Sequence, residues 1–518
     1  MTYHRFSLAI CLLLFILSGI PRLDAEEKAP TPRLRPAGID GAVLILGDKV
    51  PDAVRERFVR LAGGEKAKLV LVSIDDKAKK QRQSWEARKP ASAIALSLSS
   101  REAAIDPDFL KPLRQATGVW FEGEISPSRA LEKELLAVLK RGGIAAGTAL
   151  LCRRLPDGKE EPRQRRIHLL PGTVIAPLFD ANRKARLLSF MAKHPKMVGV
   201  GMSAEAALLV KGREMRVLGR GSVTVCLAAC LWRPARIVEL RAGSQSDFTM
   251  WRRAALARGE AAFPAAKAAV PEVPRGSLVI VGGGAMPPSI LRKFIDLAGG
   301  PDVPIVVLPT AQPDPIPARF GESTLFEKAG AKNVHILPKR GLKDVEDPKN
   351  LEWLRKAKGV WFGGGRQWRF VDAYEGTKAE PLFGDVLRRG GVLGGSSAGA
   401  SIQAEYLVRG SPLNNTDMMC EGYERGLGFL PGVAVDQHFA ARRRFADMTG
   451  LMKTYPQLLG IGIDESTALV VQGHVGEILG RGKVYFYDRR KPFAKDGPDY
   501  EAIKRGGRYD LKERKVLP

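Results

Sequence analysis

Short apolar runs alternate with amphipathic stretches along most of the chain. Near the start, an apolar run at 41–47 precedes a helical pattern that ends in Gly63 and Gly64, and a second apolar run follows at 69–72. Apolar runs of about 4–8 residues bounded by turn residues are typical of buried strands, and a helical pattern between two of them marks a βαβ unit. The hydrophobic pattern therefore predicts an α/β fold with mostly parallel central sheets.

The second half of the chain repeats this pattern in the same order. The apolar run 276–282, the helix end at Gly299 and Gly300, and the run 305–308 match the three features of the first half. Four more matches follow in order: 118–121 with 359–362, 141–143 with 389–391, 170–172 with 430–432, and 217–221 with 478–482. We therefore expect a tandem duplication that folds as two three-layer α/β/α domains.

The segments outside the two copies give the expected domain boundaries. An Ala- and Pro-rich polar stretch separates the copies, and basic residues become frequent after Lys483. We predict a signal peptide at 1–25, a linker at 26–40, a first domain at 41–235, a second linker at 236–275, a second domain at 276–490 and a basic tail at 491–518.

The first residues have the pattern of an export signal. His4 and Arg5 precede an apolar run from Leu8 to Leu17, and Ala25 ends a small-residue cleavage site. The apolar run is short for a transmembrane helix, and no later run is long enough to be one. We expect export to the periplasm or the extracellular space, with an uncleaved N-terminal anchor as the alternative.

The chain is strongly basic, with a formal net charge of +26. A basic surface favours anionic partners such as acidic peptides or anionic envelope polymers. The basic residues come without a nucleic-acid-binding motif and without interleaved aromatic residues, so we expect no nucleic-acid partner. Because neither metal-ligand spacing nor a cofactor motif is present, we expect no metal and no cofactor. The sequence leaves the oligomeric state open.

Three polar sites follow apolar runs in the second copy. Gly395-x-Ser397-x-Gly399 has the spacing of a nucleophile elbow, a sharp turn that exposes one hydroxyl group. His438 ends a second apolar run, and Glu465 ends a third. A serine nucleophile needs a base, and the base needs a carboxylate that fixes its tautomer and stabilises its charged form. Since the carboxyl ends of parallel strands meet at one sheet edge, we predict that these three residues meet there.

The predicted triad has two candidate acids and a distinctive chain order. Asp464 is the alternative acid, because neighbours in an extended stretch point to opposite sides. The chain order is serine, histidine, acid, with the acid 27 residues after the histidine. An α/β-hydrolase has the order serine, acid, histidine, so the elbow does not indicate that class of enzyme.

Four motifs of the second copy, at 362–367, 394–400, 436–439 and 462–465, resemble those of the peptidase E and cyanophycinase family. Members of that family are serine exopeptidases whose fold is similar to class I glutamine amidotransferases. The resemblance implies a triad of Ser397, His438 and Glu465. It also implies an oxyanion hole formed by backbone N–H groups near Gly364 or Gly365 and of Ala398.

The same resemblance implies a substrate-binding set: Gln367, Asp436, Gln437, Arg442 and Arg444. The matching positions in cyanophycinases help to hold a β-linked aspartyl residue, and a guanidinium group suits its carboxylate. The chain departs from the family at Arg366, where an acidic or amide residue is usual, and at Asp447, where a further arginine is usual. We expect a serine peptidase for acidic or β-aspartyl peptides, with cyanophycin as a candidate. A non-catalytic basic protein that binds anionic polymers is the alternative.

The first copy has lost the predicted chemistry. Alignment of the repeats pairs each proposed catalytic residue with an apolar one: Ser397 with Ala149, His438 with Leu178, and Glu465 with Ala204. The first copy keeps the strand, helix and glycine motifs of the repeat but has no polar residue at these three positions. The fold itself therefore does not require the polar groups. The first domain is therefore expected to be a pseudoenzyme domain.

Overall fold

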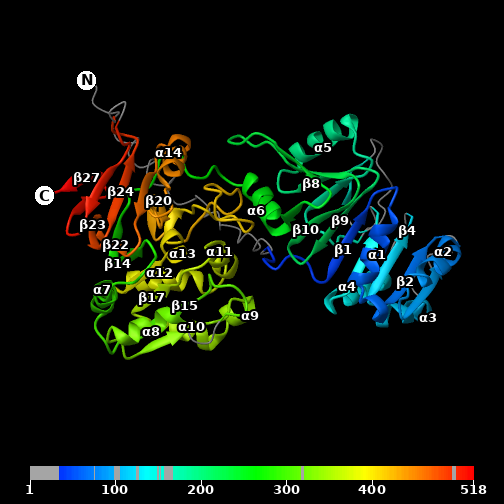
Figure 1. Ribbon diagram of the computed structural model, residues 1–518, viewed down its shortest axis with the longest axis horizontal. Coiled ribbons are helices and arrows are strands. Elements are labelled where there is room, and N and C mark those ends of the chain that lie inside the picture. Colours follow the sequence, from blue (N-terminus) through cyan, green and yellow to red (C-terminus); the bar gives the residue numbers. More distant parts are fainter. Residues whose placement is uncertain are drawn as a thin grey trace, which may run out of the picture. The chain divides into compact units, whose positions relative to one another are not determined.

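The structure, a computed structural model, describes residues 34–74, 76–98, 106–123, 128–148, 151, 153–156, 167–316, 320–492 and 497–518 (Figure 1). The expected signal peptide at 1–25 and Ala149 lie outside these residues. In this part of the chain, no helix combines the length and the apolar character that crossing a membrane requires.

The second half of the chain contains a nine-stranded sheet with a parallel centre. Its strands are β14 (Val273–Val281), β15 (Ile305–Leu308), β16 (Val334–Ile336), β17 (Gly359–Phe362), β18 (Val392–Ser396), β22 (Thr467–Gly473), β23 (Val475–Gly480), β26 (Arg508–Asp510) and β27 (Lys515–Leu517). They are ordered β16-β15-β17-β18-β14-β22-β23-β26-β27. The first five of these in space are mutually parallel, and β22 joins β14 in the antiparallel direction.

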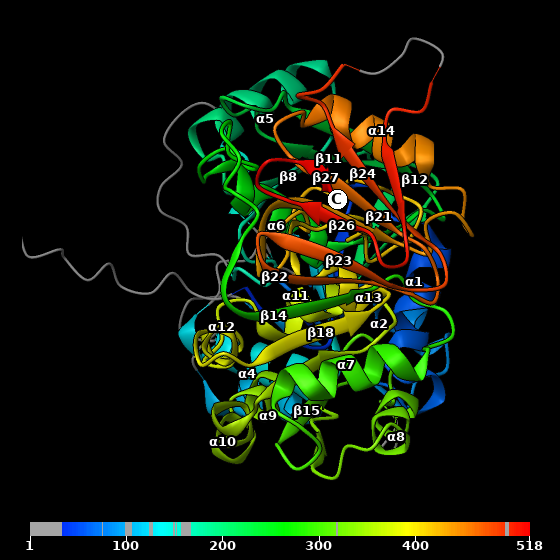
Figure 2. The same ribbon diagram turned by 90° about the vertical axis from the view of Figure 1, so that its left-hand side faces the viewer.

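Helices cover both faces of this sheet. They are α7 (Pro288–Ala298), α8 (Gly321–Lys328), α9 (Leu342–Val345), α10 (Pro348–Lys356), α11 (Trp368–Tyr374), α12 (Glu380–Arg388) and α13 (Ala398–Ser401). Because successive side chains of a strand alternate, Val279 and Val281 share a buried cluster with α7 and α8, whereas Leu278 and Ile280 share one with α10 and α12. Figure 2 shows α10 and α12 to the left of β15 and β18, and α8 to the right. The three-layer α/β/α architecture predicted for this half is thereby confirmed.

A second, five-stranded sheet carries the later motifs. Its strands are β19 (Ala404–Tyr406), β20 (Leu430–Gln437), β21 (Leu459–Ile463), β24 (Lys483–Asp488) and β25 (Glu501–Lys504), in that spatial order. The strands β20 and β21 are parallel, so their carboxyl ends lie side by side. Met448 and Leu451 of α14 (Phe445–Thr454) pack against this sheet in a cluster with Ala434 and Tyr487.

The first half of the chain has the same strand order, except that its eight-stranded sheet has no counterpart of β27 among the described residues. Its larger sheet runs β3-β2-β4-β5-β1-β9-β10-β13, and its smaller sheet runs β6-β7-β8-β11-β12. The strands are β1 (Ala42–Leu46), β2 (Lys68–Ser73), β3 (Ser92–Ser97), β4 (Gly118–Glu122), β5 (Ile144–Gly147), β6 (Arg153–Arg154), β7 (Thr173–Ala176), β8 (Val198–Met202), β9 (Ala206–Lys211), β10 (Glu214–Gly219), β11 (Ser222–Leu227), β12 (Arg236–Arg241) and β13 (Gln245–Asp247). The helices are α1 (Asp52–Leu61), α2 (Lys77–Glu86), α3 (Pro107–Leu110), α4 (Arg129–Lys140), α5 (Ala181–Lys193) and α6 (Phe248–Arg258), with 3₁₀ turns at Gly64–Lys66 and Lys111–Gln115.

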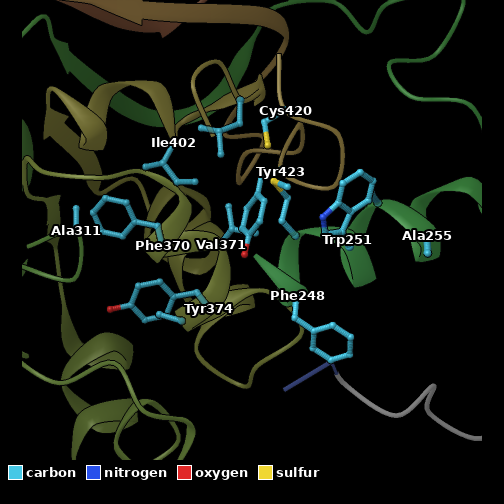
Figure 3. Close-up of a cluster of buried hydrophobic side chains, with 14 of the residues drawn as sticks. Phe248, Trp251, Ala255, Ala311, Phe370, Val371, Tyr374, Ile402, Cys420 and Tyr423 are labelled. Carbon is cyan, nitrogen blue, oxygen red and sulfur yellow. The ribbon is translucent and has the colours of Figure 1, made fainter. Parts of the chain in front are cut away.

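The stretch 236–275, expected to be a linker, is folded instead. It contains β12 and β13, which extend the two sheets of the first half, and the buried helix α6. The Arg258 guanidinium of α6 donates to the Glu421 carboxylate at 2.5 Å, and Trp251 shares a buried cluster with Tyr423 (Figure 3). The polar composition indicated a linker, but Asp247, Arg253 and Arg258 are buried and ion-paired inside the protein.

The expected basic tail, 491–518, is likewise folded in part. It supplies β25, which pairs with β24, and the hairpin of β26 and β27, which extends the nine-stranded sheet. Arg514, one of its basic residues, is buried and donates to the Asp488 carboxylate at 2.9 Å. The C-terminal charges therefore partly serve the fold of the second half.

Candidate active site

Ser397 lies in the tight turn between β18 and α13. Its φ of 56° and ψ of −111° are rarely adopted by L-residues, and such a conformation costs about 1–3 kcal/mol. A Cβ on Gly399 would lie 1.8 Å from the carbonyl oxygen of Phe362, so only glycine lets this turn approach β17. The Ser397 N–H donates to the carbonyl of Val281, the last residue of β14, at 3.0 Å. The turn thus holds Ser397 at the carboxyl end of the parallel sheet.

His438 follows β20 directly and also has a left-handed backbone, with φ of 51°. Its N–H donates to the carbonyl of Gly282 at 2.7 Å. A Cβ on Gly283 would lie 2.3 Å from the His438 Cε1 atom. The glycine turn after β14 therefore makes room for the imidazole ring.

Two hydrogen bonds link the three predicted triad residues. The Nε2 atom of His438 lies 2.9 Å from Ser397 Oγ, and its Nδ1 atom lies 2.6 Å from Glu465 Oε1. Glu465 follows β21 closely, and its side chain is 44% exposed. Burial is the main cause that lowers the pKa of His438 below 6.5, partly offset by the hydrogen bond with Glu465. The lowered pKa favours the neutral ring, which can accept a proton from the serine hydroxyl.

Asp464, the alternative acid, faces away from His438 and binds the surrounding backbone. Its Oδ1 accepts the N–H of Ala440 at 3.0 Å, and its Oδ2 accepts the N–H of Lys483 at 3.0 Å and the Tyr485 hydroxyl at 3.2 Å. The structure places Glu465, and not Asp464, on the imidazole.

The three residues implied for an oxyanion hole differ in how their N–H groups are used. The Gly364 N–H donates to Glu322 Oε1 at 3.3 Å, and the Gly364 carbonyl accepts from Gln312 Nε2 at 2.6 Å. For the N–H groups of Gly365 and Ala398, no acceptor lies within the part of the chain that the structure describes. Of the three, Gly365 and Ala398 are thus the residues whose N–H groups are not used within the described part of the chain.

The predicted substrate residues Asp436 and Arg444 are joined to each other. Asp436 is fully buried and accepts from the Arg444 guanidinium at 2.6 Å. It also accepts from Arg409, a residue that the sequence motifs did not single out, at 3.0–3.2 Å. Arg444 itself is only 4% exposed, so its charge is neutralised inside the protein.

The remaining predicted substrate residues separate into buried and exposed groups. Gln367 is buried and donates to the carbonyl of Val408 at 2.8 Å. Gln437 is also buried, and its Oε1 has no hydrogen-bond partner among the described residues. Arg442, in contrast, is exposed, and its charge contributes to the lowered pKa of His438.

Both departures from the family pattern have structural partners. The Arg366 guanidinium donates to the carbonyl of Ser411 at 2.6 Å and to that of Asn414. The Asp447 carboxylate accepts from Arg409 at 2.6 Å. Arg366 and Asp447 therefore fix the segment that follows β19.

The expectation that all three residues meet at one sheet edge is wrong, because Ser397 follows β18 of the nine-stranded sheet, whereas His438 and Glu465 follow β20 and β21 of the five-stranded sheet. The three side chains meet between the carboxyl ends of two sheets. A strained serine, a histidine and a carboxylate in hydrogen-bonded order are the arrangement that serine hydrolases use. No cluster of three or more His, Cys, Asp or Glu side chains that could hold a metal ion occurs among the residues described.

Comparison with known proteins gives a consistent family. The model of peptidase family S51 matches residues 278–479. A cyanophycinase from Geminocystis herdmanii is 32% identical over 220 residues, which cover 41% of this chain and 81% of that protein. A cyanophycinase from Trichormus variabilis is 28% identical over 268 residues, 48% of this chain and 90% of that protein. The crystal structure of a peptidase from an acI-B1 actinobacterium matches with a TM-score of 0.35 and 22% identity, covering 46% of this chain and 97% of that one.

The chain belongs to peptidase family S51, and it is a serine-type peptidase.

Proposed function

We propose that this peptidase hydrolyses acidic or β-aspartyl peptides, with Ser397 as nucleophile, His438 as base and Glu465 as the acid that orients the histidine. The observation that carries the proposal is the pair of hydrogen bonds from Ser397 through His438 to Glu465. The strained backbone of Ser397 supports the nucleophile's role, because such strain is kept where function requires it.

In the proposed reaction, Ser397 Oγ attacks the carbonyl carbon of the scissile bond while His438 Nε2 takes the hydroxyl proton. The resulting imidazolium is stabilised by Glu465, and the N–H groups of Gly365 and Ala398 bind the oxyanion. His438 then gives the proton to the leaving amine as the C–N bond breaks, which leaves an acyl-serine ester. Water, deprotonated by His438, attacks the ester, releases the carboxylic acid and restores the serine.

The proposed preference for acidic substrates rests on the charge near the nucleophile. Arg442 is exposed beside His438, so it is the cation that we assign to the substrate carboxylate. The other four predicted substrate residues are buried: Gln367, Asp436, Gln437 and Arg444. We propose that they support the backbone around the substrate-binding region. The relatives named cyanophycinases support β-aspartyl substrates. At Arg366 and Asp447 this chain departs from the residues usual in the family, and we propose that its substrate preference differs from that of the cyanophycinases.

We further propose that the chain arose by tandem duplication, with a non-catalytic first half that includes β12 and β13 and a catalytic second half that runs from β14 to β27. The common strand order of the two halves supports this. Leu178 and Ala204 stand where the second half has His438 and Glu465. Export through the N-terminal segment 1–25 is proposed on its sequence pattern alone.

The test is product release from purified full-length protein. Substrates are β-aspartyl-arginine polymer and a panel of α- and β-linked aspartyl dipeptides. We expect release by the wild type and by Ser396→Ala, a control at the neighbouring serine, and none by Ser397→Ala. Equal release by Ser397→Ala, or none by the wild type from any substrate, would refute the proposal.

A further inference from the structure

Glu322, in the first turn of α8, binds the glycine turn beside Ser397. Its Oε2 accepts the indole N–H of Trp361 at 2.7 Å, and its Oε1 accepts the N–H of Gly364 at 3.3 Å. Gln312 holds the carbonyl of the same glycine from another segment, at 2.6 Å. Both polar backbone atoms of Gly364 are thus fixed by side chains.

The carboxyl group is close to the proposed nucleophile. A Cβ placed on Gly364 would lie 3.6 Å from the Ser397 Cβ and 3.7 Å from Glu322 Oε1. The serine Cβ and the carboxyl oxygen are therefore no more than 7.3 Å apart, the sum of these two distances. Glu322 binds the N–H of Gly364. The next N–H in the same turn, that of Gly365, has no acceptor within the described residues.

We propose that Glu322 is a positioning residue for the oxyanion hole: by holding the N–H of Gly364 it fixes the turn and leaves the N–H of Gly365 for the oxyanion. This inference rests on the proposed function of Ser397. It assigns Glu322 no contact with substrate. It also gives different roles to Gly364 and Gly365, between which the sequence does not decide: the N–H of Gly364 binds Glu322, and the N–H of Gly365 binds the oxyanion.

The protonation of Glu322 then affects the reaction. Burial raises the pKa of its carboxyl to about 7, against the opposing effect of the hydrogen bonds from Trp361 and Gly364. The other charged residues in the second half of α8, Glu327 and Lys328, are exposed, and among the described residues none forms an ion pair with Glu322. A carboxylate here repels a developing oxyanion, so the neutral form is the active one.

The expected consequence is a bell-shaped dependence of kcat/KM on pH. Activity rises as His438 loses its proton below pH 6.5, and it falls as Glu322 ionises near pH 7. Repulsion between two like charges at an effective dielectric constant of about 20 amounts to a fall of roughly 10-fold or more when they lie within about 10 Å.

The test compares the pH profiles of Glu322→Gln and Glu327→Gln, the latter an exposed control on the same helix. Glu322→Gln is neutral at every pH, so the descending limb disappears. The side-chain NH₂ of the glutamine cannot accept a hydrogen bond, so either the Trp361 or the Gly364 N–H loses its acceptor. The glycine turn is then less well fixed, and kcat at pH 6 falls several-fold with little change in KM. Glu327→Gln keeps the wild-type profile. A Glu322→Gln profile that superimposes on the wild type overturns the inference.

A second measurement does not depend on activity. The indole N–H of Trp361 reports the charge of Glu322, so its NMR signal in Ser397→Ala titrates with a midpoint near pH 7. The titration is absent when Glu322→Gln is added. A Trp361 signal that stays constant from pH 5 to 9 overturns the inference even if the peptidase assay succeeds. Activity that survives in Ser397→Ala refutes the proposed function instead.

Discussion

Leu178 and His438 occupy the same backbone turn in the two halves of the chain. Their φ angles are 48° and 51°, and both are left-handed. In each half the following phenylalanine donates its N–H to the last residue of the neighbouring strand: Phe179 to Met202 at 2.9 Å, and Phe439 to Ile463 at 3.1 Å. The turn that presents a base in the second half is thus present in the first half with an apolar side chain.

This relationship predicts that the strain at Leu178 can be relieved without loss of function. Leucine is unfavourable at positive φ, whereas asparagine tolerates it, and the Leu178 side chain is 43% exposed. We expect Leu178→Asn to raise the free energy of unfolding by about 0.5–1 kcal/mol with kcat unchanged. The matched change His438→Asn relieves the same strain and should lower kcat by about 100-fold or more. Urea denaturation and peptidase assays measure both, and destabilisation by Leu178→Asn would argue against the strain.

Glu465 and Asp464 are expected to have separable roles. Glu465→Gln should lower kcat by about 100-fold to 10⁴-fold, because the carboxylate no longer stabilises the imidazolium of His438. Asp464→Asn should lower the free energy of unfolding by about 1–3 kcal/mol, since it binds the N–H groups of Ala440 and Lys483. Folded Asp464→Asn should keep most of its kcat. The opposite pattern would make Asp464 the functional acid.

Gly283 is predicted to be essential for the position of the imidazole. In Gly283→Ala the new methyl group meets His438 Cε1 at 2.3 Å, so the ring is displaced and kcat falls by about 100-fold or more. Gly300→Ala is the control: its φ is 110°, close to the 93° of Gly283, but its Cβ meets nothing within 4 Å. Steady-state kinetics of the two variants tests the prediction, and an equal kcat in both would show that Gly283 is not needed to place the imidazole.

Arg442 is predicted to contribute to the position of the acid limb of the pH profile, the rise in activity as His438 loses its proton. Its charge helps to lower the pKa of His438, so Arg442→Gln raises that pKa and the limb moves to higher pH. More imidazole is then protonated at a given acidic pH, and activity there is lower. Arg443→Gln, at an exposed neighbour, should not move the limb. A shift to lower pH in Arg442→Gln, or equal limbs in both variants, would be the contrary result.

The pattern around Ser397, His438 and Glu465 predicts that each follows a buried strand, which the structure shows, but not that these strands belong to two sheets. The glycine turn after β14 links the two sheets, because the Gly282 and Gly283 carbonyls accept the N–H groups of His438 and Ser466. The choice between Asp464 and Glu465 was not accessible from the pattern, because it depends on which side chain binds the backbone of Ala440.

The partners of the buried charges could not be predicted from sequence. Arg409 precedes Asp436 by 27 residues, and only the path of the chain after β19 brings their side chains together. Glu322 belongs to no motif, yet α8 brings it to Gly364, 42 residues later. In the same way, the polar composition of 236–275 does not predict that α6 is buried. Its residues Arg253 and Arg258 pair with Asp372 and Glu421, which lie more than 100 residues further along the chain.

The claim that Ser397 is the nucleophile is tested most directly by fluorophosphonate labelling of the full-length protein, followed by peptide mapping with mass spectrometry. We expect one phosphonate adduct, on Ser397, absent in Ser397→Ala and formed far more slowly in His438→Ala. Full labelling of Ser397→Ala, or an adduct on another residue with Ser397 unmodified, would contradict the account.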